Sequence, residues 1–137
     1  METSVTRVLV VEDCAPFRKF IWSMLGKRPE LQIVAEVTDG LEAVKKVDEL
    51  QPDLIILDIG LPSLNGIETA RRIRKVSPGS KILFLSQESS VDVVQEALRT
   101  GAHGYVVKSD AGCELLDGAN TVLRGEQFVG GRFCVHH

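Results

Sequence analysis

Short apolar runs alternate along this chain with longer segments in which apolar residues recur every three or four positions. Four of the runs are almost wholly apolar, namely residues 8–11, 54–57, 82–85 and 105–107. Runs of this length that are rich in Val, Ile and Leu are typical of parallel strands, because helices cover both faces of a parallel sheet. The alternation therefore restricts the chain to an α/β fold.

Residues 31–37 form a fifth candidate strand with a different pattern. In this segment Leu31, Ile33, Ala35 and Val37 mostly alternate with Gln32, Val34 and Glu36. Alternation of this kind indicates a strand with one side facing solvent. We therefore expect it at an edge of the sheet.

Five segments with helical spacing follow the five strands. Their apolar stripes are Phe17, Phe20, Ile21, Met24 and Leu25; Leu41, Val44, Val47 and Leu50; Ile67, Ala70 and Ile73; Val93, Val94, Ala97 and Leu98; and Leu115, Ala119, Val122 and Leu123. Pro16 lies near a helix start, and Gly101 and Gly125 lie where helices should end. This (βα)₅ pattern predicts a doubly wound, five-stranded parallel sheet with right-handed crossovers. With residues 31–37 at the edge, the strand order is the flavodoxin-like 2-1-3-4-5.

The length of 137 residues is that of one domain. We expect this domain to span residues 1–125. Residues 126–137 are too few for a second domain and are predicted to be a tail, or the start of a linker or tag, without an output domain. The three cysteines, Cys14, Cys113 and Cys134, lack a C-x-x-C or zinc-ligand spacing and are expected to be buried, reduced thiols.

The charge balance excludes several classes of protein. Sixteen Lys and Arg against 19 Asp and Glu leave a net charge of −3, without the basic excess of a chain that coats nucleic acid. The apolar runs fall far short of the roughly 20 residues that span a bilayer, and no secretory signal opens the chain. We therefore expect a cytoplasmic protein that binds neither nucleic acid nor membrane itself.

Polar residues follow four of the predicted strands, at the point where each strand ends. These residues are Glu12 and Asp13, Asp58, Ser86 and Lys108. The carboxyl ends of parallel strands meet at one edge of the sheet, where open α/β sheets bind their ligands. Taken singly, each residue is more often a helix cap, a turn residue or a surface charge. Their coincidence at four strand ends favours a site.

Three carboxylates at one edge repel one another, and a cation relieves that repulsion. An all-oxygen ligand set favours Mg²⁺. Lys108 and the Ser86 hydroxyl on the other flank suit an anion such as a phosphoryl group, whose oxygens they can share with the metal. Among the carboxylates, Asp58 is the central candidate for the nucleophile of aspartyl-phosphate chemistry.

Four motifs carry a resemblance to a known family: VLVVED at residues 8–13, LIILDIGLP at 54–62, NG at 65–66 and ALRTGAHGYVVK at 97–108. In combination they resemble the receiver domain of bacterial two-component response regulators, and the last motif resembles the NarL/FixJ-like (LuxR-type) subgroup. The resemblance covers about residues 6–125.

The resemblance implies a role for each residue of the predicted site. Asp58 is the implied phosphoacceptor. Asp13 and Asp58 are implied direct Mg²⁺ ligands, Glu12 holds the metal through water, and the Gly60 carbonyl completes the protein ligands.

A second set of roles implied by the resemblance concerns the response to phosphorylation. Ser86 and Lys108 sense the phosphoryl group, and Tyr105 is the aromatic residue that moves inward on activation. Two departures from the family pattern stand out: Ser109 replaces the proline that often follows the lysine, and Gln87 replaces a small residue.

The second departure bears on phosphoryl access. Gln87 begins the loop over the phosphoryl site, where its side chain can cover the approach to Asp58. Glu88 next to it is expected to repel an anionic donor.

The function implied by the resemblance is a switch rather than an enzyme. A sensor histidine kinase or phosphotransfer protein phosphorylates Asp58, and a homodimer on phosphorylation is a further implied partner. A DNA-binding output domain is usual in the subgroup and is absent here. We expect Phe17 and Phe20, beside Arg18 and Lys19, to contribute to the choice of kinase.

Three alternatives stay open from the residues. One is a stand-alone or unphosphorylated receiver that serves as a protein-interaction module. Another is a phosphotransferase of the haloacid-dehalogenase type, although its D-x-D pair is missing because Gly60 lies two positions after Asp58. The third, a nucleotide- or flavin-binding domain, lacks both the G-x-G-x-x-G and the G-x-x-x-x-G-K-[ST] motifs.

Overall fold

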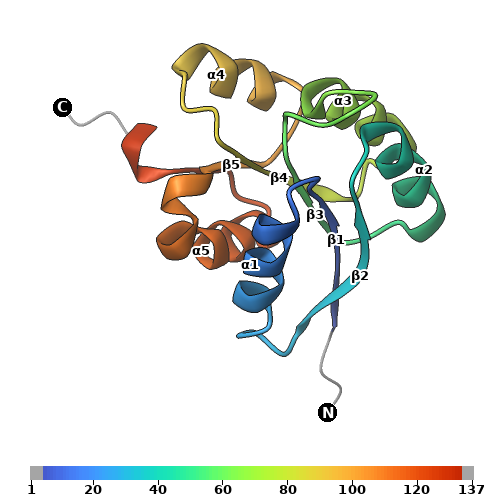
Figure 1. Cartoon of the computed structure of the whole chain (residues 1–137), viewed down its shortest axis with the longest axis horizontal. Coiled ribbons are helices and arrows are strands. Elements are labelled where there is room, and N and C mark those ends of the chain that lie inside the picture. Colours follow the sequence, from blue (N-terminus) through green and yellow to red (C-terminus); the bar gives the residue numbers. More distant parts are fainter. Residues whose placement is uncertain (1–4, 134–137) are drawn as a thin grey trace.

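A single parallel sheet forms the centre of the molecule, and helices cover both of its faces (Figure 1). The computed structural model describes residues 5–133. The strands are β1 (Thr6–Val11), β2 (Leu31–Val37), β3 (Leu54–Leu57), β4 (Lys81–Ser86), β5 (Gly104–Val107) and β6 (Phe128–Val129), in the order β2-β1-β3-β4-β5-β6. The helices are α1 (Ala15–Leu25), α2 (Gly40–Leu50), α3 (Gly66–Val76), α4 (Val91–Arg99) and α5 (Ala111–Leu123), with short 3₁₀ helices η1 (Lys108–Asp110) and η2 (Gly131–Phe133).

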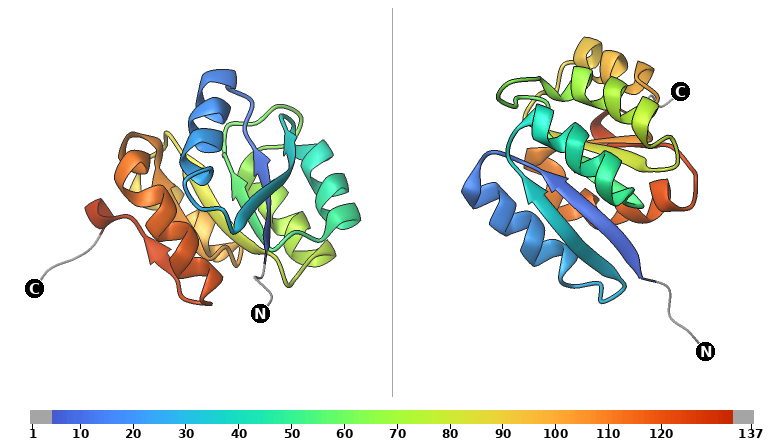
Figure 2. Two further views of the ribbon diagram at one scale, coloured as in Figure 1. Left: turned by 90° about the horizontal axis from the view of Figure 1, so that it is seen from below. Right: turned by 90° about the vertical axis from the view of Figure 1, so that its right-hand side faces the viewer.

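The helices divide into two layers (Figure 2). Helices α1 and α5 pack on one face of the sheet, with side chains such as Ile21 and Leu115 in one apolar cluster. Helices α2, α3 and α4 pack on the other face, around Val47 and Ile73. The central strands are buried on both sides, which explains their uninterrupted apolar runs. The predicted fold class and the order 2-1-3-4-5 are confirmed, and β2 lies at the edge with Gln32 and Glu36 exposed.

The sheet has six strands rather than the predicted five. Phe128 and Val129, which the sequence analysis assigned to a tail, pair in parallel with Gly104 and Tyr105 of β5. A strand of two residues is too short to show as an apolar run in the sequence. It forms because β5 would otherwise be a bare edge, with unpaired backbone groups. The expected tail also includes residues 134–137, which lie outside the described residues.

The burial expected for the cysteines is wrong. Cys14 and Cys113 are free thiols, but both are exposed: Cys14 at the N-cap of α1 and Cys113 on α5. Cys134 lies outside the described residues.

Local sequence signals define the helix ends. Asp39 and Asn65 each accept a hydrogen bond from a backbone N–H in the first turn of α2 and α3, at 3.0 Å. Gly101 and Gly125 follow α4 and α5 with φ of +94° and +86°, a conformation that favours glycine. Within residues 5–133 no helix is both long enough and apolar enough to cross a membrane.

Candidate phosphoryl and metal site

The residues that follow the strands come together around one hollow at the carboxyl edge of the sheet. Its volume is about 400 Å³, and it is lined by Glu12, Asp13, Cys14, Asp58, Ile59, Gly60, Ser86, Gln87, Glu88 and Lys108. Except for Tyr105, which lies below in β5, every predicted site residue lines this hollow. The parallel strand order brings them together, because β1, β3, β4 and β5 all end at this edge.

Lys108 lies between two carboxylates in the floor of the hollow. Its Nζ is 2.9 and 3.0 Å from the two oxygens of Glu12, and 3.0 Å from Asp58 Oδ2. Only 9% of the Lys108 side chain and 1% of the Glu12 side chain are exposed. Charges this deeply buried need partners, and each of the three groups has one.

The burial of this cluster shifts two pKa values. Burial raises the pKa of Glu12; the hydrogen bond from Lys108 opposes this shift, and the charge of Asp58 adds to it. Burial alone would lower the pKa of Lys108, but its hydrogen bonds to Glu12 and Asp58 together outweigh burial, so the net shift is upward. Lys108 is therefore an ammonium ion in hydrogen-bond contact with the Asp58 carboxylate.

The position of Asp58 depends on a close approach between β3 and α3. A Cβ on Gly66, the first residue of α3, would lie 2.0 Å from the Asp58 carbonyl oxygen, so only glycine fits. Asp58 Oδ1 accepts a hydrogen bond from the Ile59 N–H at 2.7 Å. Together with the contact from Lys108 to Oδ2, this bond fixes the orientation of the carboxylate.

Three carboxylates form a group that suits a divalent cation. Glu12, Asp13 and Asp58 each offer one oxygen, and these oxygens lie within 4.8 Å of one another. Asp13 is exposed on the open side of the hollow, and the exposed Gly60 lies on its rim. A hard, oxygen-only set with an open side fits Mg²⁺, which keeps several of its waters.

Ser86 and Tyr105 lie next to the hollow and share a partner. The buried Ser86 hydroxyl accepts a hydrogen bond from the Glu88 N–H at 3.2 Å, while the Tyr105 hydroxyl donates to the Glu88 carbonyl at 2.8 Å. Burial raises the pKa of Tyr105 to about 12, although a hydrogen bond with Ser86 opposes the shift. The ring of Tyr105 is 0% exposed, so in this structure it already lies in the inward position.

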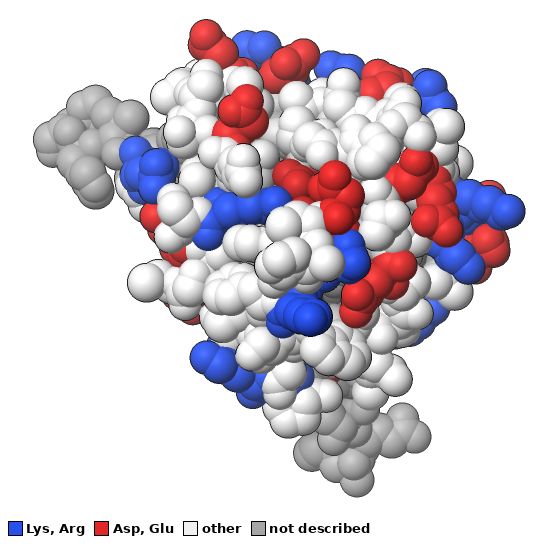
Figure 3. Space-filling model, in the orientation of Figure 1, with Lys and Arg blue, Asp and Glu red and all other residues white. Residues whose placement is uncertain are grey.

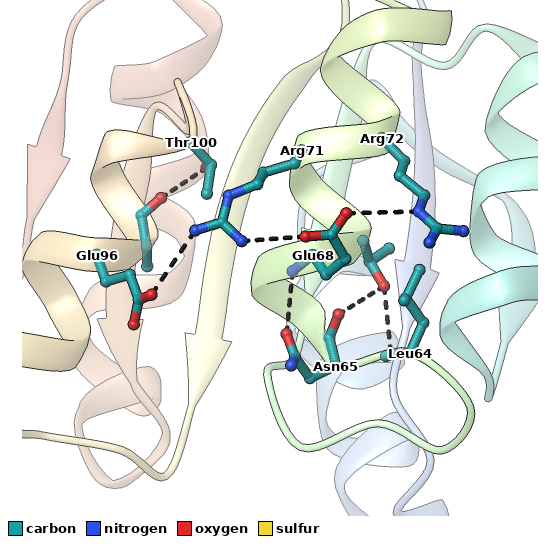
Figure 4. A network of polar contacts seen from close by, with 9 residues as sticks. Leu64, Asn65, Glu68, Arg71, Arg72, Glu96 and Thr100 are labelled. Carbon is teal, nitrogen blue, oxygen red and sulfur yellow. Dashed lines mark hydrogen bonds and ion pairs between the residues drawn. The ribbon is translucent and has the colours of Figure 1, made fainter.

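Gln87 and Glu88 are exposed at the rim of the hollow, on the loop between β4 and α4. Helix α4 beyond this loop is joined to α3 by charged side chains (Figure 4). Arg71 on α3 lies 3.1 Å from Glu68 on its own helix and 3.7 Å from Glu96 on α4. These side chains are 38–55% exposed, so each ion pair contributes little to the free energy of folding.

Two contacts at the site were not predicted from the sequence. The ring of Phe17 covers Lys108, with Nζ 4.6 Å from the ring centroid, and Phe20 packs against that ring at 5.1 Å. Arg18 donates to the Glu12 carbonyl at 2.9 Å, and so supports the residue that pairs with the lysine. Both residues were expected to meet a kinase. The only signal in the sequence for these contacts is that Phe17 and Arg18 lie in the first turns of α1, shortly after Asp13.

This fold and this site are those of a known family. Residues 8–119 match the response regulator receiver domain, and the chain belongs to that family. Its NarL/FixJ-like character is supported by a solved LuxR-family response regulator from Aurantimonas sp. SI85-9A1. The two structures superpose with a TM-score of 0.89 at 30% identity, over 94% of this chain and 92% of the other.

Two curated proteins are similar to this chain over most of its length, and one of them is much longer than the other. The transcriptional regulatory protein DegU of Brevibacillus brevis is 32% identical over 90% of this chain and 52% of its own length. The chemotaxis protein CheY of Thermotoga maritima is 34% identical over 86% of this chain and 98% of its own length. The chain therefore spans about half of DegU and corresponds to nearly all of CheY. It is a receiver domain of two-component signalling, a phosphoacceptor switch.

Proposed function

We propose that Asp58 is the phosphoacceptor of this receiver domain. The observation that carries the proposal is the arrangement around Lys108, whose ammonium group lies 3.0 Å from Asp58 Oδ2 at the floor of an open hollow. A nucleophilic carboxylate beside a fixed cation, at a strand end, is what aspartyl-phosphate chemistry requires.

In the proposed reaction a carboxylate oxygen of Asp58 attacks the phosphorus of the donor in line with the leaving group. The new O–P bond forms as the bond from phosphorus to the donor's nitrogen or oxygen breaks, and the leaving group keeps that electron pair and takes up a proton. The phosphoryl group adds about −1.5 to −2 charges. Lys108 is in place to pair with it, because its ammonium group already contacts Asp58.

We propose that Asp13, Asp58 and the Gly60 carbonyl hold a Mg²⁺ ion directly, and that Glu12 holds it through water. The cluster of carboxylate oxygens within 4.8 Å supports this assignment. When bound, the ion supplies positive charge beside the phosphoryl oxygens. Lys108, which contacts Glu12 and Asp58, would pair its ammonium group with another phosphoryl oxygen.

The switch that we propose begins at Ser86 and Tyr105. The Ser86 hydroxyl is buried at the edge of the hollow, where it can donate to a phosphoryl oxygen. Ser86 and Tyr105 share Glu88 as a partner, so a new bond at Ser86 changes the loop that leads into α4. The exposed ion pair between Arg71 on α3 and Glu96 on α4 presents a small barrier to that movement.

The partners we propose are a sensor histidine kinase or a phosphotransfer protein as donor, and a second phosphorylated copy of the chain. Because a histidine kinase draws its phosphoryl group from ATP, we place this exchange in the cytoplasm. Self-phosphorylation and self-dephosphorylation are the only chemistry we assign, so the chain acts as a switch and not as an enzyme on other substrates.

We propose further that the switch controls transcription through a DNA-binding domain outside this chain. The support is the likeness to a LuxR-family regulator and to DegU, which is about twice as long. The chain itself should not bind duplex DNA. Its net charge is −3, and Lys and Arg are interspersed with Asp and Glu on the face shown in Figure 3.

The test is intact mass after incubation with Mg²⁺ and acetyl phosphate. We expect the wild type to gain one phosphoryl group that strong acid and alkali both remove, as for an acyl phosphate. Asp58→Asn should gain none, while Asp117→Asn, at an exposed aspartate on α5, should gain it at the wild-type rate. An adduct that persists in Asp58→Asn, or no adduct in the wild type, contradicts the proposal.

A further inference from the structure

Residues 128–132, here called the C-terminal strap, lie beyond the part of the chain that matches the family, which ends at residue 119. The strap begins as β6 and continues into η2. Phe128 N–H donates to the His103 carbonyl at 3.0 Å, and Gly130 N–H donates to the Tyr105 carbonyl at 3.1 Å. The strap is therefore bonded along β5, the strand that carries the switch tyrosine and leads into Lys108.

Small residues make room for the strap. A Cβ on Gly118 of α5 would lie 3.1 Å from the ring of Phe128, and a Cβ on Gly104 would lie 3.0 Å from its carbonyl oxygen. A Cβ on Gly130 would lie 2.6 Å from a carboxylate oxygen of Glu114, whose other oxygen accepts from the Gly131 N–H at 2.9 Å. Contacts this close, at residues of the strap, β5 and α5, show that the strap packs tightly against the domain.

The end of the strap is hydrogen-bonded to the segment that carries Lys108. Arg132 Nε lies 2.7 Å from Asp110 Oδ2, and its Nη2 lies 2.9 Å from Asp110 Oδ1 and 3.1 Å from the hydroxyl of Ser109. Ser109 and Asp110 form η1 together with Lys108, which reaches Glu12 and Asp58 from the other end of this single turn. A bidentate arginine–carboxylate pair fixes direction as well as distance.

We infer that the strap positions Lys108 for its work at Asp58, with Arg132 as the positioning residue, and that phosphorylation in turn stabilises the strap. The inference rests on the proposed phosphorylation of Asp58. Lys108 already lies 3.0 Å from Asp58 Oδ2, so a strap that holds the Lys108 turn in this position favours the phosphorylated site. Coupling between two sites is reciprocal, so phosphorylation of Asp58 in turn stabilises the strap.

The strap is also the path by which the chain leaves the domain. After Arg132 the backbone continues toward the C-terminus, and in DegU the region that matches this chain is only 52% of the protein. A segment that touches both Tyr105 and the Lys108 turn is placed to carry the state of the site to whatever follows it.

The first experiment is a double-mutant cycle on the rate of labelling by acetyl phosphate at saturating Mg²⁺. Arg132→Met and Asp110→Asn should each slow labelling about threefold, because a small misplacement of a reacting group lowers the rate. The double variant should be no slower than either single variant, since both remove the same contact. Arg132→Lys, which keeps a charge but loses the fork, should recover part of the rate.

The matched control is Arg124→Met. Arg124 is also an arginine in the C-terminal region with a carboxylate partner, Glu126 at 3.6 Å, but the side chains of that pair are 60% and 64% exposed against 40% and 29% for Arg132 and Asp110, and neither residue belongs to η1 or the strap. Its labelling rate should equal that of the wild type. Equal rates for Arg132→Met and the wild type, or an equal loss in Arg124→Met, would overturn the inference.

The second experiment measures amide hydrogen exchange in the full chain. In Arg132→Met without phosphodonor, the amides of Ser109 and Asp110 should exchange at least about threefold faster than in the wild type. Phosphorylation of the wild type should slow exchange at Gly130 and Gly131 by a similar factor. Unchanged exchange in both comparisons contradicts the inference even if labelling differs.

The two experiments separate this inference from the proposed function. A wild type that accepts no phosphoryl group refutes the proposed function, and the exchange in Arg132→Met still decides whether the strap holds the Lys108 turn. A wild type that is labelled at Asp58 and an Arg132→Met variant labelled equally fast refute only the strap.

Discussion

The two ends of the central sheet bury polar groups in opposite ways. At the carboxyl end, Glu12, Asp58 and Lys108 are charged and at most 9% exposed. At the amino end the buried polar groups are neutral: the Ser80 hydroxyl donates to the Pro52 carbonyl at 2.5 Å and lies 2.7 Å from the Ser77 hydroxyl.

The difference shows what each end contributes. Neutral hydrogen bonds between buried groups stabilise a fold without the desolvation of a full charge. Buried charges have a large desolvation free energy and stay only when they are paired, so a charged cluster is a weak source of stability. The neutral hydrogen bonds at the amino end therefore contribute to the stability of the fold. The carboxyl end keeps charges that can exchange partners when a metal and a phosphoryl group arrive.

The sharpest test of the carboxyl end is Asp13→Ala. Asp13 is exposed and is the ligand we expect to meet Mg²⁺ directly, so its loss should lower the Mg²⁺ affinity by about 100-fold. The free energy of unfolding without Mg²⁺ should not fall. Titration calorimetry gives the affinity, and Asp117→Ala serves as the control. Equal affinity in Asp13→Ala and the wild type would refute the metal assignment.

The matching test of the amino end is Ser80→Ala. The substitution leaves the buried Pro52 carbonyl without its hydrogen-bond partner and removes one of the two partners of the Ser77 hydroxyl, so we expect it to lower the free energy of unfolding by about 1–3 kcal/mol. Labelling of Asp58 should keep its rate. Urea unfolding measures the loss, with the exposed Ser23→Ala as control. A large drop in labelling would show that the two ends are not separable.

Phe17→Leu tests whether the ring over Lys108 belongs to the site. Leucine keeps the apolar packing but removes the aromatic face 4.6 Å from Nζ, so labelling by acetyl phosphate should slow about threefold. Phe20→Leu removes the neighbouring ring, which packs against Phe17, and should leave the rate unchanged. If the two variants behave alike, Phe17 serves only as packing.

Gln87→Ala should speed labelling by a small donor about twofold, because the shorter side chain opens the approach to Asp58. Gln87 is exposed at the rim and is not one of the three carboxylates that could hold Mg²⁺, so the Mg²⁺ affinity should stay the same. Ser89→Ala, on the same loop, is the control. The comparison is made at saturating Mg²⁺, and labelling that is equal or slower in Gln87→Ala would remove the gating role.

The smallest expected effect concerns pH at the amino end. Burial, helped by the charges of Lys81 and Arg74, lowers the pKa of His103, whose neutral Nδ1 accepts from the Ile82 N–H at 3.1 Å. The unfolded chain therefore takes up a proton first, near pH 6.5, and stability is lost as the pH falls from there through the lower folded pKa.

We expect this loss to be about 0.5 kcal/mol or less, because the ring is partly exposed. The free energy of unfolding of His103→Gln should fall less than that of the wild type between pH 7 and pH 5. Urea unfolding at both pH values makes the comparison. A parallel fall in the two proteins would mean that the carboxyl-end charges account for the pH dependence.

The sequence by itself determined the architecture and the membership of the site. Uninterrupted apolar runs such as residues 54–57 are compatible only with strands covered on both sides, and the alternation in residues 31–37 identified the edge. Parallel strands must end at one edge, so the residues after them had to meet. That is why Asp58 and Lys108, 50 positions apart, could be placed together without coordinates.

The tertiary structure alone decided how those residues pair and what lies around them. Phe17 and Lys108 meet because α1 packs beside α5, the helix that η1 leads into, and no spacing in the sequence encodes that distance. The bond of Lys108 to both Glu12 and Asp58 depends on angstrom-scale positions within the edge. Strand β6 exists only because the open edge of β5 supplies its hydrogen bonds, which is a property of the assembled sheet and not of the two residues that form it.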